Sequence, residues 1–100
     1  MKNLKMEIER IITKKYKQDL KLVRKRGKSF QKLGVILSLI ENNYKSNRPL
    51  LPSRYCLHKL TGRYKGSWEC HIEPDWLLIF TLSENQLKLE RTGSHSDLFK

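Results

Sequence analysis

The sequence has few cysteines and no long apolar run. Its 100 residues include two cysteines, Cys56 and Cys70, and no Cys-x-x-Cys pair, so we expect neither a disulfide framework nor a zinc site built from thiolates. The longest apolar run, residues 76–80, has five residues, whereas a helix needs about 20 to cross a bilayer. The opening residues MKNLK lack the apolar stretch of a secretion signal. These absences predict a cytoplasmic protein with no membrane role.

Acidic residues are also scarce relative to basic ones. The chain has 21 Lys and Arg against 10 Asp and Glu, a formal net charge of +11. The surplus belongs to the front two thirds, because residues 1–34 hold twelve basic and three acidic side chains, whereas residues 66–100 hold three and six. A positive field of this size suits a polyanion or an acidic protein partner. The alternative is a solvated face that only keeps the protein soluble.

No element carries the paired spacing of a metal site. The three histidines, His58, His71 and His95, form no His-x-x-x-His pair, and Cys70 and His71 are neighbours that would point to opposite faces of a strand. A nucleophilic Cys56 beside a histidine would lack an accompanying Gly-rich oxyanion motif. We therefore predict no metal and no other cofactor.

The first half of the chain has helical periodicity. After a short opening strand within residues 6–13, the segment that follows Thr13 places apolar residues three and four apart among lysines and arginines, and this predicts an amphipathic helix that ends near Gly27. Ser29 is the predicted N-cap of a second helix. Residues 47–66 are punctuated by Pro and Gly and predict a long functional loop.

The second half alternates like strands. Residues 67–72, 76–82 and 86–91 are separated by turn-forming segments and predict a three-strand antiparallel meander, with Arg91 in line with the core residues Leu87 and Leu89. The chain is long enough for one core. We therefore expect one α+β domain over residues 1–100, with two N-terminal helices packed on one face of a small antiparallel sheet.

The residue types of the last 43 positions suit cleavage of RNA without a metal. That reaction needs one group to take the 2′-OH proton, another to protonate the departing 5′-oxygen, and a cation for the phosphorane charge; histidine titrates near neutral pH and fits the first two tasks. Arg91 and His95 flank a short polar turn that could aim both at one phosphate. Alternatively, Arg91 pairs with Glu69, Glu73 or Glu90.

The segments LHKLTGRYKGSWECHIEPDWLLIF and ERTGSHSDLF resemble the C-terminal half of the YafQ branch of the RelE/ParE toxin superfamily. His-x-Leu-x-Gly, (Cys/Ala)-His-x-x-Pro-Asp-Trp and Arg-x-Gly-(Ser/Thr)-His-x-x-Leu-Phe recur there in this order. The resemblance covers about residues 51–99. It implies a RelE/ParE-like fold with a short C-terminal tail that carries site residues, and an endoribonuclease that cleaves mRNA in the ribosomal A site.

The resemblance also implies a set of site residues. The catalytic residues would be His58, His71, Asp75, Arg91, His95 and Phe99. His95 would be the leading acid or base, supported by His58 and His71, with Asp75 orienting one histidine and Arg91 binding the scissile phosphate. The substrate-binding residues would be Lys59, Arg63, Lys65 and Trp76. Trp76 could instead fill the core, and Asp75 could simply form a turn.

One motif departs from the family pattern. Where relatives commonly read Asp-His-Pro-Leu, this chain reads Leu57-His58-Lys59-Leu60, so the carboxylate and the rigid proline beside the histidine are missing. His58 would therefore have to fill its implied role without the acidic residue and the proline that flank the histidine in relatives.

The implied partners are nucleic acid and protein. Basic residues of the first helix would clamp ribosomal RNA through a salt-sensitive contact, namely Lys14, Lys15, Lys17, Lys21, Arg24, Lys25, Arg26 and Lys28. A cognate antitoxin would hold the chain inactive in a hetero-oligomeric complex, which can bind operator DNA through the antitoxin. Two alternatives are a ParE-like toxin that targets DNA gyrase and a basic RNA-binding module without chemistry.

Overall fold

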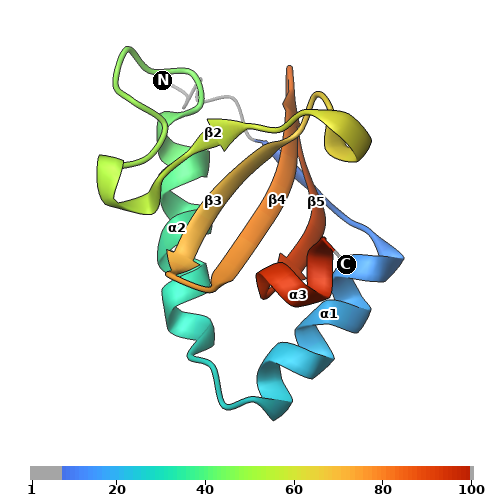
Figure 1. Ribbon diagram of the computed structural model, residues 1–100. Helices are drawn as coiled ribbons and strands as arrows, with labels where there is room; N and C mark the ends of the chain where they lie inside the picture. Colours follow the sequence, from blue (N-terminus) through green and yellow to red (C-terminus); the bar gives the residue numbers. More distant parts are fainter. Residues whose placement is uncertain (1–7, 100) are drawn as a thin grey trace.

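Five strands and three α-helices make up the part of the chain that the computed structural model describes, residues 8–99 (Figure 1). The elements are β1 Glu9–Ile12, α1 Lys14–Lys25, α2 Phe30–Asn43, β2 His58–Lys59, β3 Trp68–Glu73, β4 Trp76–Ser83, β5 Gln86–Gly93 and α3 His95–Leu98, with 3₁₀ turns η1 Ser53–Tyr55 and η2 Gly62–Tyr64. The strand order is β1-β5-β4-β3-β2. In Figure 1, α2 lies behind the sheet and α3 in front of it.

The α+β fold predicted from the sequence is confirmed, and two strands extend the meander at its edges. β1 pairs in parallel with β5, where the Glu9 N–H donates to the Asn85 carbonyl at 2.8 Å. Of the predicted opening strand, residues 6 and 7 lie outside the described part of the chain. β2 consists of two residues of the predicted loop, which pair antiparallel with the start of β3. The sheet is therefore mixed.

The two long helices begin where the sequence predicts. The Thr13 side chain accepts the Tyr16 N–H at 3.1 Å and donates to the Leu89 carbonyl at 2.9 Å, so it caps α1 and ties the helix to β5. α1 ends just before Gly27, which has φ +76°. Ser29 is the N-cap residue of α2, although its side chain makes no capping hydrogen bond. No helix among the described residues is long and apolar enough to cross a membrane.

The core lies between the helices and one face of the sheet. β3 alternates as far as Ile72, so that Cys70 and Ile72 face the helices while Glu69 and His71 face the other way. A bulge between His71 and Glu73 then turns Glu73 to the helix side as well. The other core residues come from α1, α2, β4 and β5 and from the loop after α2. They are Tyr16, Val23, Leu33, Ile36, Leu37, Ile40, Leu51, Trp76, Leu78, Phe80, Leu87 and Leu89. A smaller cluster on the opposite face joins Leu77 and Ile79 to Leu98 of α3. This second face is left for polar side chains.

A bulge in β5 changes the side of the sheet to which Arg91 belongs. Phe80 pairs with Leu89, but the next residue back on β4, Ile79, pairs with Arg91, so Glu90 is an extra residue. Arg91 therefore lies on the face of Ile79, opposite to Leu89. The prediction that Arg91 is in line with Leu87 and Leu89 is wrong, because simple alternation cannot reveal an inserted residue.

Trp76 is fully buried on the helix side of the sheet. It is 1% exposed, and its indole N–H donates to Thr92 Oγ1 at 2.9 Å. The Thr92 hydroxyl in turn donates to the Leu77 carbonyl at 2.7 Å. Trp76 fills the core, so the prediction that it contacts substrate is wrong.

Removing the acceptor of the Trp76 indole should destabilise the fold. Thr92→Val should lower the free energy of unfolding by about 1–3 kcal/mol, because a buried donor loses its partner. Trp76→Phe removes the donor instead, and the double variant should cost less than the two single variants together, as measured by urea unfolding. Strictly additive costs would show that this hydrogen bond contributes nothing.

Candidate active site

The three histidines come together on the face of the sheet that is not covered by α1 and α2. His58 comes from β2, His71 from β3 and His95 from the start of α3. The ring centroids of His58 and His71 lie 6.4 Å apart, and those of His71 and His95 lie 5.8 Å apart. The three histidines therefore lie near one another, including His58, which lacks its usual sequence neighbours.

A buried carboxylate lies next to two of these histidines. Glu69 is 4% exposed, and its Oε1 lies 3.2 Å from Nε2 of His58 and 3.6 Å from Nε2 of His71. His58 Nδ1 is 2.9 Å from the Cys56 carbonyl, so both ring nitrogens of His58 lie close to oxygen atoms. From the sequence, Glu69 was expected only as a possible partner of Arg91. Its alternation with His71 on β3 could have placed it on this face.

Asp75 orients His95. Its Oδ1 lies 2.9 Å from the backbone N and 3.0 Å from Nδ1 of His95. These contacts, the backbone one first, hold the pKa of the Asp75 carboxyl below its usual value. A carboxylate at Nδ1 favours a proton on that nitrogen and leaves Nε2 for chemistry. The sequence prediction that Asp75 orients one histidine agrees with this geometry.

The short helix α3 is fixed by a dense set of polar contacts. Ser94 and Asp97 form a capping box, and Arg26 at the end of α1 makes a bidentate pair with Asp97 at 2.6 and 3.1 Å. Gly93 has φ +157°, and a Cβ there would lie 2.9 Å from Asp97 Oδ2, so a glycine is required. Leu98 anchors the helix underneath, at 1% exposed. His95 is thereby held over the sheet.

Arg91 lies on the same face of the sheet as the histidines and is paired. Its guanidinium makes a bidentate ion pair with Asp19 of α1 at 2.7 and 3.1 Å, and it also donates to the Tyr64 hydroxyl at 3.2 Å. The hydrogen bonds that Arg91 donates to Asp19 are the main cause that raises the pKa of Arg91 above its ordinary value. The alternative prediction, that Arg91 pairs with a carboxylate, therefore holds for the type of partner. The partner is Asp19 rather than Glu69, Glu73 or Glu90.

Aromatic rings border the histidines on the side of α3. The Phe99 ring lies 5.8 Å from that of Tyr64 in an edge arrangement and 6.1 Å from that of His95. Phe99 is 42% exposed, so one side of its ring is open to a ligand. The sequence analysis assigned Phe99 to the site but did not identify Tyr64.

The basic residues predicted to bind substrate are placed unequally. Lys59 lies over the Trp68 ring at 5.1 Å, on the opposite face of the sheet from its neighbour His58. This placement separates Lys59 from the histidines. Arg63 in η2 and Lys65 directly after it are exposed on the loop whose Tyr64 packs against the histidine face. They remain candidates for substrate contact.

Three of these side chains could also hold a metal ion. One ligand atom each from Glu69, His71 and His95 lie within 4.8 Å of one another. Two imidazoles and a carboxylate form a donor set that suits copper or zinc. Glu69 and His71 lie two residues apart on one face of β3, whereas His95 comes from α3, so sequence spacing alone could not indicate the complete set.

Comparison with known proteins defines the family. The sequence model described as a bacterial toxin of type II toxin-antitoxin systems, YafQ, matches residues 8–100. The mRNA interferase toxin YafQ of Escherichia coli K12 is 44% identical over 84 residues, which are 84% of this chain and 87% of that protein.

Solved structures have the same fold. The E. coli DinJ-YafQ toxin-antitoxin complex matches with a TM-score of 0.82 and 39% identity, over 94% of this chain and 99% of that one. A copper-bound mutant toxin from Helicobacter pylori matches with a TM-score of 0.78 and 32% identity, over 92% and 99%. Fold and site together define the class as a small α+β toxin of a type II toxin-antitoxin system. Within that class, the chain belongs to the YafQ family.

Loss of the Asp97 carboxylate should loosen the support of His95. Asp97→Ala removes half of the capping box and the Arg26 pair, and should lower the free energy of unfolding by about 0.5–2 kcal/mol at neutral pH. Arg26 holds the pKa of Asp97 well below its usual value, so this stabilisation is complete above about pH 4 and is lost as the pH falls further.

The difference between wild type and Asp97→Ala should therefore shrink in acid, and amide hydrogen exchange at residues 94–98 should be faster in the variant at pH 7. Ser96→Ala, an exposed position of the same helix, is the matched control. Equal exchange in all three proteins would rule out a supporting role for this ion pair.

Proposed function

We propose that the chain is an mRNA interferase, an endoribonuclease that cuts mRNA on the ribosome in the cytoplasm and is neutralised by a cognate antitoxin. The observation that carries this proposal is the grouping of His58, His71 and His95 with two carboxylates, Glu69 and Asp75. The printed name of the E. coli relative, an mRNA interferase toxin, supports the substrate. The DinJ-YafQ complex supports the antitoxin partner.

The proposed reaction requires only the RNA substrate and two groups that transfer protons. The ribose 2′-oxygen attacks the adjacent phosphorus, the bond from phosphorus to the 5′-oxygen breaks, and the products are a 2′,3′-cyclic phosphate and a 5′-hydroxyl. One group accepts the 2′-OH proton, and a second protonates the 5′-oxygen. His95, with Nδ1 held by Asp75, carries one transfer at Nε2. His71 carries the other, with Glu69 stabilising the charge that develops on its ring.

Arg91 supplies the cation for the phosphorane. The raised pKa of its guanidinium keeps it charged throughout, and its pairing with Asp19 holds it in one orientation on the histidine face. The fixed orientation means that little reorganisation is needed when charge develops on the phosphate oxygens. His58, whose Nε2 lies 3.2 Å from Glu69, completes the group of imidazoles on this face.

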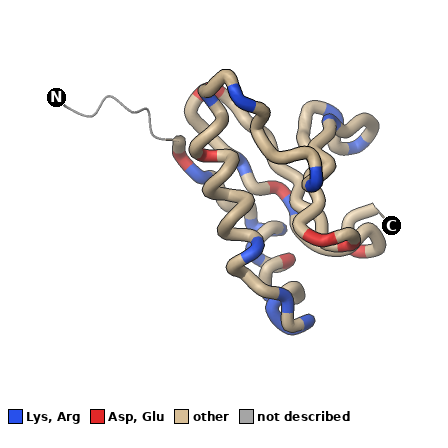
Figure 2. Tube along the Cα trace, turned by 90° about the vertical axis from the view of Figure 1, so that its left-hand side faces the viewer, with Lys and Arg blue, Asp and Glu red and all other residues tan. Residues whose placement is uncertain are grey.

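Basic residues of α1 would contact ribosomal RNA. Lys and Arg occur along the molecule and gather near the lower end of the view where α1 is followed by α2 (Figure 2). Two of the eight basic residues assigned to this role form ion pairs within the protein, Arg26 with Asp97 and Lys28 with Glu73 at 2.7 Å. The other six are exposed and suit a sequence-independent phosphate contact.

Removal of the His95 imidazole should abolish cleavage without unfolding the protein. His95→Ala should slow cleavage of ribosome-bound mRNA by about 10²–10⁴-fold, the usual contribution of a general acid or base, and should relieve growth arrest when the chain is expressed without antitoxin. Mapping of mRNA 5′ ends checks this, with Ser96→Ala as the control. If wild-type induction creates no new ends within codons, a gyrase-targeting toxin or a simple RNA binder is favoured instead.

A transition metal should bind the catalytic groups and stop the reaction. The H. pylori relative is described as copper-bound, and Glu69, His71 and His95 of this chain offer a suitable donor set. We infer that Cu²⁺ inhibits cleavage by occupying the imidazoles that must carry protons.

Excess EDTA should leave the cleavage rate unchanged, whereas added Cu²⁺ should lower it. Electron paramagnetic resonance should show weaker Cu²⁺ binding in His71→Ala and unchanged binding in Cys56→Ser, which removes an exposed thiol. Loss of activity in EDTA would contradict metal-independent catalysis, and unaltered copper binding in His71→Ala would contradict the assigned ligands.

A further inference from the structure

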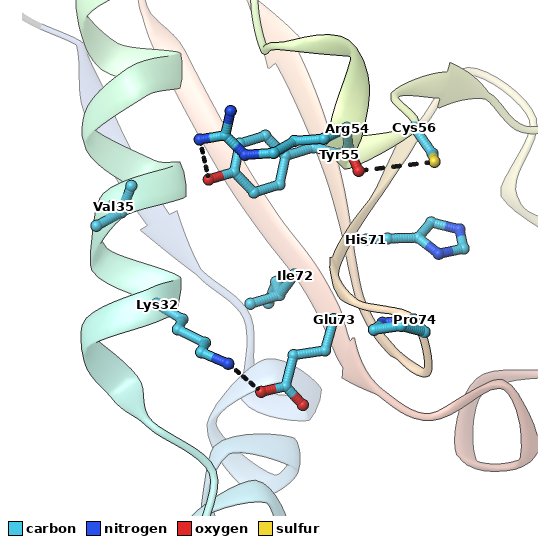
Figure 3. A pocket seen from close by; sticks show the side chains of 9 residues that line it. All are labelled: Lys32, Val35, Arg54, Tyr55, Cys56, His71, Ile72, Glu73 and Pro74. Atoms are coloured by element: carbon cyan, nitrogen blue, oxygen red, sulfur yellow. Dashed lines mark hydrogen bonds and ion pairs between the residues drawn. The ribbon is translucent and has the colours of Figure 1, made fainter.

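A groove opens at the free edge of β3, next to the catalytic histidines. It has a volume of about 660 Å³ and lies between α2, η1 and β3. Figure 3 shows Arg54 and Tyr55 at one end, the Lys32–Glu73 ion pair at the other, and Val35 and Ile72 between them. β2 pairs with only Trp68 and Glu69 of β3, so among the described residues no strand covers the edge from His71 onward. A groove of this size can hold a nucleotide.

The groove is continuous with the catalytic face. His71 lines it together with Cys56 and Pro74, and Figure 3 shows the His71 ring between these two residues, pointing away from Val35 and Lys32. A strand of RNA whose phosphate lies at His71 could therefore pass around the β3 edge into the groove. The reacting phosphate and the groove would then hold successive parts of one chain.

The upper end of the groove suits a nucleobase. The Arg54 guanidinium lies 4.7 Å from the centre of the Tyr55 ring and donates to the Tyr55 hydroxyl at 3.2 Å, so its plane is held in place. Within residues 8–99 Arg54 has no carboxylate partner. Guanidinium planes and aromatic rings are the surfaces on which proteins stack unpaired bases. Val35, 48% exposed, offers an apolar wall to the base edge.

The charges near the groove favour an anionic ligand. Glu73 at its lower end is bound by both Lys28 and Lys32, at 2.7 and 2.8 Å, and these hydrogen bonds lower the pKa of Glu73. Two lysines and Arg54 therefore outweigh one carboxylate. Such a balance attracts the sugar-phosphate backbone of RNA.

We propose that this groove is a subsite for a base that flanks the cleaved bond, with Arg54 as the stacking platform and Val35 as its wall. The proposal rests on the ribonuclease function proposed above and extends it to the choice of cleavage site. An extended segment of a protein partner would also fit an open strand edge. The stacked Arg54, the surplus positive charge and the continuity with His71 favour RNA.

The first experiment measures binding without cleavage. The four nucleoside 5′-monophosphates are titrated into the protein while the methyl signals of Val35 and Ile72 are followed by NMR. We expect these signals to shift, and Arg54→Ala to weaken binding by roughly 5- to 100-fold, the range for loss of one base stack. Arg48→Ala removes the same charge from an exposed site outside the groove and should weaken binding far less.

The second experiment measures the choice of cleavage site. Val35→Trp should fill the groove and change the base preference next to the cut, as read by mRNA 5′-end mapping, whereas Ser38→Trp, at an exposed position of the same helix, should not. Methyl signals that do not move with any nucleotide, or an unchanged preference in Val35→Trp, would overturn the subsite.

The outcomes also separate this proposal from the function on which it rests. A wild-type protein that binds nucleotides in the groove but never cleaves mRNA would sink the ribonuclease and with it the subsite for cleavage. Active cleavage with no nucleotide binding in the groove would sink the subsite alone. Loss of antitoxin binding in Val35→Trp, without any nucleotide shifts, would assign the groove to the protein partner.

Discussion

The alternation of side chains along β3 is the constraint on which both the core and the site depend. Cys70 and Ile72 are buried against the helices, while Glu69 and His71 between them face the other side. A slip of one residue would exchange the two sets, so burial of the apolar set fixes the direction of Glu69 and His71. Each fully buried apolar side chain contributes about 1.5–3 kcal/mol. The orientation of His71 is thus determined by packing on the opposite face of the sheet.

Periodicity in the sequence was sufficient to predict most of the fold. The two helices, their start positions at Thr13 and Ser29, and the meander all follow from local patterns, and local patterns are what propensity and capping act on. β1 and β2 were harder to place. Glu9 of β1 pairs with Gln86, 77 positions away, and Lys59 of β2 pairs with Trp68, 9 positions away. Nothing within a four-residue or two-residue segment specifies such a partner.

The site was less predictable than the fold, for two physical reasons. The bulge at Glu90 turns Arg91 to the face of the sheet that carries the histidines, and an inserted residue leaves no mark in an alternating pattern. Its partner Asp19 is 72 positions away, so the carboxylate could not be found among sequence neighbours. The histidines were assigned through resemblance to a family. The environment of each one, including Glu69, emerges only when β2, β3 and α3 are folded together.

Carboxylates lie next to the histidines and to Arg91 on this face of the sheet. Glu69 lies beside His58 and His71, Asp75 lies beside His95, and Asp19 pairs with Arg91. A phosphodiester that met these acids alone would be repelled, so in the function proposed above the positive charge on this face has to outweigh them. The carboxylates that hold the imidazoles and the guanidinium in place therefore also set how much positive charge a bound phosphate would need there.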